Sequence, residues 1–139
     1  MRLMKTFLLS IFLISLISVS CAQNVADHTI DVDSLRQKMK TDTSFVLLDV
    51  RTPSELTTPP LGHIDGVMNI PVQQLEQRVN ELEPYKDKEI VVICRSGHRS
   101  SIATGILLKH GFNATNVAGG MLRFRATEKE KPVKKQTAE

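Results

Sequence analysis

The stretch Glu89-Ile90-Val91-Val92-Ile93 runs directly into Cys94-Arg95-Ser96-Gly97-His98-Arg99-Ser100, and this junction decides the fold. The apolar run is typical of a strand that is buried on both faces, as in parallel sheets. The following loop turns into a helical pattern, so its backbone N–H groups and the positive end of the helix face the thiol. Because the loop carries two arginines and a histidine and no acidic residue, we expect it to favour a thiolate and to hold an anion beside it.

The same alternation of an apolar run and a helical pattern continues along the chain. A short edge strand is expected to begin at Ile30. The other expected strands are 45–50, 67–70, 90–93 and 116–118, and the expected helices are 31–40, 54–56, 72–83, 100–110 and 121–125. Strands that alternate with helices indicate an α/β fold in which a parallel sheet is covered on both faces.

The helices carry recognisable end signals and apolar faces. Asp31 or Asp33 is suited to cap the first helix, and Pro84 is expected to end the helix at 72–83. The helix at 100–110 is expected to bury a stripe formed by Ile102, Ala103, Ile106 and Leu107. These features predict which side of each helix meets the sheet.

Polar residues at a second strand end add to the candidate site. Ligands of parallel sheets bind at the carboxyl ends of the strands, and Asp49 and Arg51 reach such an end just as Cys94 does. Both residues could contact a substrate, but we favour a supporting role in which they pair with the loop charges. For Cys94 the alternative is a small buried core residue, which the adjacent arginines, glycine and histidine disfavour.

The first 22 residues have the pattern of an export signal. Arg2 and Lys5 precede an apolar run over 7–19, and Ser20-Cys21-Ala22 follows it. A membrane span is the alternative, but the run is shorter than the roughly 20 residues that cross a bilayer. Cleavage after Ala22 and lipidation of Cys21 both fit, so we expect an exported protein that is periplasmic or lipid-anchored to a bacterial membrane.

Charge and cysteine content limit the possible partners. Without Arg2 and Lys5, the 18 basic residues fall to 16 against 15 acidic residues. That balance gives no reason to expect nucleic-acid binding. With Cys21 removed or lipidated, Cys94 is the remaining thiol, which excludes an internal disulfide and favours a chemical role. No Cys/His spacing suggests a metal, and we expect no cofactor.

The remaining chain divides into three parts. We expect a polar tether over 23–29, one domain over 30–126, and a charged, disordered tail over 127–139. A chain of 139 residues with 41% apolar content has room for one such domain. Because that domain buries a full core alone, a monomer is expected.

Several motifs, in order, resemble the rhodanese-like (sulfurtransferase) family. They are Leu48-Asp49-Val50-Arg51 followed by Glu55, Gly62-His63-Ile64 with Gly66, Asn69-Ile70-Pro71, the loop Cys94–Arg99, Gly111-Phe112, and Val117-Ala118-Gly119-Gly120-Met121. The resemblance covers roughly residues 31–125 and is closest to single-domain exported members. It implies a central parallel five-stranded sheet with helices on both faces. Two departures are a longer stretch between Glu55 and Gly62, and Phe124 in place of a common Trp.

The resemblance implies sulfur transfer through a cysteine persulfide. Cys94 would be the nucleophile, and the residues expected to bind the substrate are Arg95, Ser96, Gly97, His98 and Arg99. The thiolate would attack a small anionic donor such as thiosulfate and form a covalent persulfide. The loop N–H groups would stabilise the terminal sulfur, and cyanide or a thiol would then remove it.

Three other functions share parts of this pattern. A periplasmic persulfide carrier or thiol-redox partner would use the same thiolate chemistry, and the sequence does not separate it from a small-molecule transferase. A non-catalytic binding module is less favoured because the cysteine is retained. A phosphatase or arsenate reductase is disfavoured, because only four residues separate Cys94 from Arg99 and cysteine phosphatases use a longer loop.

Overall fold

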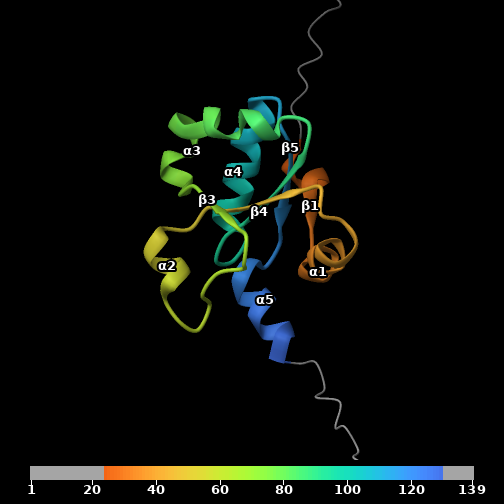
Figure 1. The fold of residues 1–139 in the computed structure, drawn as a ribbon, viewed down its shortest axis with the longest axis vertical. Helices are drawn as coiled ribbons and strands as arrows, with labels where there is room; N and C mark the ends of the chain where they lie inside the picture. The colour runs from red at the N-terminus through yellow and green to blue at the C-terminus, as the bar shows by residue number, and fades with distance from the viewer. Residues whose placement is uncertain (1–23, 130–139) are drawn as a thin grey trace, which may run out of the picture.

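The sheet is parallel throughout and has five strands in the order β1-β5-β4-β2-β3 (Figure 1). The computed structural model describes residues 24–129. The strands are β1 (Thr29–Ile30), β2 (Val46–Asp49), β3 (Met68–Asn69), β4 (Glu89–Ile93) and β5 (Asn113–Val117). The predicted α/β fold with a central parallel five-stranded sheet is confirmed, and β4 is its middle strand.

Helices cover both faces of the sheet (Figure 1). The α-helices are α1 (Val32–Thr41), α2 (Pro53–Thr57), α3 (Val72–Arg78), α4 (His98–Lys109) and α5 (Gly120–Lys129), and the 3₁₀ helices are η1 (Val25–His28) and η2 (Val79–Tyr85). Ile90 and Val92 of β4 pack with α3 and α4, whereas Val91 and Ile93 pack with α1 and α5. Successive side chains of a strand point to opposite faces of the sheet. Because helices cover both faces, β4 needs apolar residues at successive positions.

The buried side of α4 differs from the predicted stripe. Its buried residues are Ser100, Ala103, Thr104 and Leu107, whereas Ile102 is 49% exposed. The prediction for Ile102 was wrong because it chose the buried side of the helix from the apolar residues alone. The observed spacing of three and four residues from Ser100 places two hydroxyl side chains against the sheet.

Several boundaries also differ from the prediction. Residues 23–29 were expected to be a tether, yet Val25–His28 forms η1 and Thr29 pairs with Asn116 of β5. The helix expected over 72–83 becomes 3₁₀ at Val79 and includes Pro84. The 3₁₀ spacing places the buried residues Val79 and Leu82 three positions apart on one side.

The C-terminal helix extends past its predicted end. It reaches Lys129, so the start of the segment expected to be a disordered tail is helical. The Thr127 hydroxyl donates to the carbonyl oxygen of Arg123 and receives a hydrogen bond from Arg36, which anchors this turn. The predicted export signal over 1–22, including Cys21, and the rest of the predicted tail lie outside the described residues. Among residues 24–129, no helix has the length and apolar character needed to span a bilayer.

Candidate active site

Cys94 lies at the carboxyl edge of the sheet, directly after β4. Asp49 ends β2 and is paired in register with Ile93, so Asp49 and Cys94 reach the same edge. This confirms the predicted placement of the two strand ends. A short loop then leads into α4, whose first residue is His98.

The sulfur of Cys94 is enclosed by hydrogen-bond donors. The Gly97 N–H donates to Sγ at 3.1 Å, and the Ser100 hydroxyl lies 3.3 Å from Sγ. Cys94 is only 1% exposed, so the thiol is buried while the loop amides are directed at it. The sequence left open whether Cys94 is a buried core residue or a thiol that faces the start of a helix. In the structure it is both.

The donors determine the protonation of this thiol. Burial raises the pKa of Cys94, but hydrogen bonds from the Ser100 hydroxyl and from the backbone N–H groups of Ser100, Gly97 and Ser96 outweigh it. The net result is a Cys94 pKa below its ordinary value. The expected shift toward thiolate therefore comes from dipoles of the loop and the first turn of α4.

Ser100 connects the sulfur to a residue on the neighbouring strand. Its hydroxyl lies 2.7 Å from Oδ1 of Asn116, 3.0 Å from the carbonyl oxygen of Gly97 and 3.3 Å from Sγ of Cys94. A hydroxyl carries one proton, so these three acceptors compete for it. A thiolate is the acceptor that gains most from that proton, because charge strengthens a hydrogen bond.

The loop arginines have different surroundings. Arg99 binds the carboxylate of Glu55 through two contacts of 2.7 and 2.8 Å, and this pairing lowers the pKa of Glu55 to about 2. Arg95 is exposed and forms no ion pair within residues 24–129. Ser96 and His98 are exposed as well. Of the two arginines that are expected to bind the anion, Arg99 is therefore neutralised by α2, and Arg95 faces solvent.

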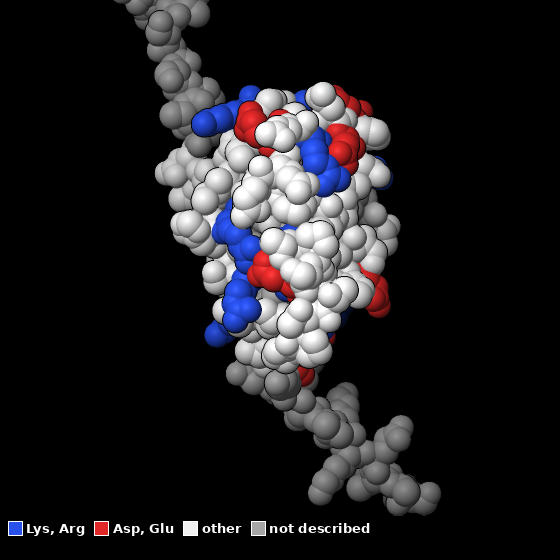
Figure 2. Space-filling model, turned by 90° about the vertical axis from the view of Figure 1, so that its left-hand side faces the viewer, with Lys and Arg blue, Asp and Glu red and all other residues white. Residues whose placement is uncertain are grey.

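A cavity of about 170 Å³ adjoins the loop. Arg95, Glu55 and Arg51 line it together with Pro59 and Pro60 of the loop after α2. The stretch between Glu55 and Gly62, whose length departs from the family pattern, thus forms part of this wall. On the face of the molecule that carries α2 and α3, basic and acidic groups lie beside one another within a largely uncharged surface (Figure 2).

Glu55 is expected to weaken the attraction of the site for anions. In Glu55→Gln the amide oxygen can still accept from the Thr52 N–H, which donates to Oε2 at 3.1 Å, while the negative charge is removed. For the anionic donor that the family resemblance implies, we expect the KM to fall about fivefold, the effect of about 1 kcal/mol of Coulomb energy. The pKa of Cys94 should also fall, since a nearby negative charge disfavours thiolate.

Steady-state kinetics and the pH dependence of Cys94 alkylation measure the two effects of Glu55→Gln. Glu81→Gln, which breaks the exposed pair with Arg78, is the matched control. A higher KM in Glu55→Gln would instead mean that Glu55 holds Arg99 in its productive position. The pKa of Glu55 is depressed from an ordinary value of 4.5 to about 2. The ion pair therefore contributes fully to stability above about pH 4.5 and loses this contribution as the pH falls toward 2.

Asp49 and Arg51 form a buried ion pair with each other, and the prediction that they pair with the loop charges was wrong. The guanidinium Nη2 of Arg51 lies 2.7 Å from Oδ2 of Asp49, and its Nε donates to both carboxylate oxygens at 3.0 Å. Residues two apart on an extended segment point to the same side, which explains the pairing. Arg51 also donates to the carbonyl oxygen of Gly62 at 2.7 Å, so the pair fixes the loop that leads to β3.

The first turn of α5 closes the cysteine loop from the other side. The Met121 N–H donates to the carbonyl oxygen of Cys94 at 2.8 Å, and the Leu122 N–H donates to that of Arg95 at 2.9 Å. Gly120 has a φ of 52°, and a Cβ there would lie 2.4 Å from the Cys94 oxygen. Gly97 has a φ of 102° and would place a Cβ 3.1 Å from the Gly119 nitrogen. Both glycines permit backbone contacts that a side chain would block.

Gly120→Ala is expected to lower the free energy of unfolding by about 2 kcal/mol or more. The left-handed conformation alone costs an L-residue roughly 1–2 kcal/mol, and the clash with the Cys94 carbonyl adds to it. Gly105→Ala is the control, because the added Cβ meets Val25 Cγ2 at an ordinary 3.6 Å and alanine favours a helix interior. Urea unfolding measures both variants, and equal stability of the two would contradict the close contact at Gly120.

Some contacts of the site have no local signal in the sequence. The pattern from Thr52 to Glu55 marks a helix start, but nothing local pointed to the contact between Glu55 and Arg99. Asn116 falls in an expected strand and Gly119-Gly120 in a motif of the resemblance, but neither pattern predicts a contact with the cysteine loop. Among residues 24–129, no group of three or more His, Cys, Asp or Glu side chains is placed to hold a metal ion.

Known proteins are similar to this chain in sequence and in fold. The rhodanese-like domain family matches residues 31–127. Over 98 residues the chain is 33% identical to an Allochromatium vinosum protein named sulfurtransferase, a match that covers 70% of this chain and 87% of that protein. A Bacillus subtilis protein, "Putative sulfur carrier protein YrkF", is 40% identical over 93 residues, which cover 66% of this chain and 48% of that relative. The chain thus spans about half the length of YrkF.

A solved structure agrees with the sequence matches. The crystal structure of a rhodanese-related protein from Thermoplasma volcanium superposes with a TM-score of 0.63 at 33% identity, covering 76% of this chain and 95% of that one. The family match extends over most of the described residues and includes the end of β4, the cysteine loop and α5 as far as Thr127. The chain belongs to the rhodanese-like domain family.

Proposed function

We propose that the protein is a sulfurtransferase that carries sulfane sulfur on Cys94, from thiosulfate or a similar anionic donor to cyanide or a thiol. The observation that supports this most is the Gly97 N–H at 3.1 Å from Sγ, together with the lowered pKa of the thiol. Relatives named sulfurtransferase support the same chemistry.

The proposed transfer has two steps. The Cys94 thiolate attacks the outer sulfur of thiosulfate, a sulfur–sulfur bond forms to Sγ, and sulfite leaves with the electron pair of the broken bond. The loop N–H groups then hold the terminal sulfur of the persulfide, where the negative charge now lies. Cyanide attacks that sulfur, thiocyanate leaves, and the thiolate is restored.

The burial of Cys94 favours a donor with a protruding atom. With 1% of the residue exposed, a donor has to insert its reacting sulfur into the loop while its charged end stays outside. Thiosulfate has that shape, because its outer sulfur projects from the sulfonate oxygens. Arg95 at the mouth supplies the cation for those oxygens, while Arg99 contributes less because Glu55 neutralises it.

Mass spectrometry of the intact protein tests the proposal directly. After incubation with thiosulfate and removal of excess donor, we expect Cys94 to gain the mass of one sulfur atom. Addition of cyanide should remove that mass and release thiocyanate. An unchanged mass with every small anionic donor would overturn the proposal. A persulfide that resists cyanide but is discharged by a protein thiol would instead indicate a persulfide carrier.

A further inference from the structure

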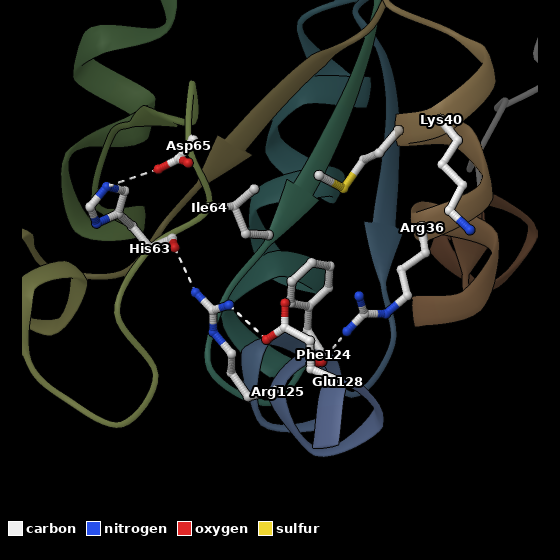
Figure 3. A pocket seen from close by; sticks show the side chains of 9 residues that line it. Arg36, Lys40, His63, Ile64, Asp65, Phe124, Arg125 and Glu128 are labelled. Atoms are coloured by element: carbon white, nitrogen blue, oxygen red, sulfur yellow. Dashed lines mark hydrogen bonds and ion pairs between the residues drawn. The ribbon is translucent and has the colours of Figure 1, made fainter. Parts of the chain in front are cut away.

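A second cavity of about 570 Å³, shown from close by in Figure 3, is lined by residues outside the cysteine loop. Its walls are α1, the loop that precedes β3, and α5, and none of the residues assigned to sulfur transfer lines it. This volume falls within the roughly 300–1,000 Å³ that is usual for small-molecule sites. The cavity is therefore large enough for an organic ligand.

The wall of the cavity combines apolar and charged groups. Ile64 and Phe124 line it and are both buried. Met39 is a further apolar wall residue. Arg36 and Lys40 project from α1 around this apolar part (Figure 3). An apolar surface with a few convergent polar groups is the usual character of a ligand site.

Arg36 is a half-buried cation that has no carboxylate partner among residues 24–129. Its guanidinium stacks on the Phe124 ring at 4.1 Å from the centroid, and its Nη2 donates to the carbonyl oxygen of Phe124 and, at 3.3 Å, to Thr127 Oγ1. Its Nε is buried and has no hydrogen-bond partner. Within residues 24–129 it forms no ion pair with a carboxylate. A cation that is partly removed from water and unpaired favours the binding of an anion.

The neighbouring charges strengthen this preference. Lys40 lies four residues after Arg36 on α1 and forms no ion pair within the described part of the chain. Arg125, by contrast, is bound to Glu128 at 2.8 Å and to the carbonyl oxygens of Leu61 and His63. The α5 side of the cavity is thus already neutralised, and the α1 side carries two cations that have no carboxylate partner among residues 24–129. Asp65, on the loop that precedes β3, adds one carboxylate to the wall, so the lining keeps a net positive charge.

From this arrangement we infer that the cavity binds an organic carboxylate with an apolar body. The carboxylate would accept hydrogen bonds from Arg36, with Lys40 adding a second positive charge. The apolar body would lie against Ile64, Phe124 and Met39, and it would remove from water the surface of Met39, which is 38% exposed. An inorganic anion would use the charge but leave the apolar wall uncovered, so the fit favours an aliphatic or aromatic acid.

Titration of the full chain with octanoate, followed by amide NMR shifts, tests the inference. Octanamide, which has the same shape without the charge, is the ligand control. We expect saturable shifts around Ile64 and Phe124 with octanoate, and binding of octanamide that is about tenfold weaker. Equal affinity for the two compounds, or no saturable shift with octanoate, would overturn the inference.

Variants test the two cations of α1 one at a time. Arg36→Gln should weaken octanoate binding about tenfold, and Lys40→Gln, which leaves the stack on Phe124 intact, should weaken it several-fold. Arg78→Gln on α3, where the arginine pairs with Glu81, is the control and should bind as the unaltered chain does. Unchanged affinity in both Arg36→Gln and Lys40→Gln would contradict the proposal. None of these readouts depends on sulfur transfer, so the result is independent of the function proposed for Cys94.

Discussion

Cys94→Ser is expected to reduce thiosulfate-to-cyanide transfer by at least about 10³-fold, to the level of the uncatalysed reaction. Serine is nearly isosteric and keeps contacts with the Gly97 N–H and the Ser100 hydroxyl, but an oxygen cannot carry the sulfur as a persulfide. A hydroxyl is also far less ionised than this thiol, whose pKa is below its ordinary value. The loss should therefore be chemical.

Steady-state thiocyanate formation measures the effect of Cys94→Ser, and circular dichroism with urea unfolding shows whether the variant is folded. We expect unchanged secondary structure and no mass gain on incubation with thiosulfate. Residual transfer within tenfold of the unaltered chain would show that the sulfur does not pass through Cys94, and the proposed function would then have to be abandoned.

Asp49→Asn is expected to lower the free energy of unfolding by about 3–5 kcal/mol, the usual cost of leaving one partner of a buried ion pair without the other. Arg51 is 0% exposed and Asp49 is 1% exposed, so water cannot replace the lost carboxylate. Such a loss is a large share of the roughly 5–15 kcal/mol that stabilises a typical domain. The substitution preserves side-chain size, which leaves the charge as the changed quantity.

Urea unfolding at neutral pH measures this loss. Asp42→Asn is the matched control, because Asp42 pairs with Lys38 at the surface and its replacement should change stability little. The double variant Asp49→Asn with Arg51→Met should regain part of the loss, since it removes the unpaired cation. If Asp49→Asn proves as mild as Asp42→Asn, the carbonyl oxygen of Gly62 alone is sufficient to hold Arg51.

The sequence predicts the fold well where the signal is local. The apolar run in β4 requires cover on both faces, and the observed packing of Ile90 and Val91 on opposite faces is its direct consequence. The loop after β4 likewise predicts donors around Cys94, because a helix start presents free N–H groups. The lowered pKa of Cys94 confirms that electrostatic expectation.

Contacts between distant segments could not be predicted in this way. Glu55 and Arg99 are 44 residues apart, and neither has a local pattern that identifies the other. Asp49 could have been paired with Arg51 from the two-residue period of an extended segment, but the loop charges were equally plausible partners. Ile102 shows the same limit, because the side of α4 that meets the sheet depends on where the helix starts.

The amides of Met121 and Leu122 complete the loop that begins at Cys94, and this has a consequence for biosynthesis. A ribosome adds these residues well after the thiol has been made, so the nascent chain carries a cysteine whose surroundings are unfinished. Full reactivity should therefore arise only once the last helix has emerged and docked. Until then the loop lacks the two backbone contacts that α5 supplies, so the site around the thiol stays incomplete.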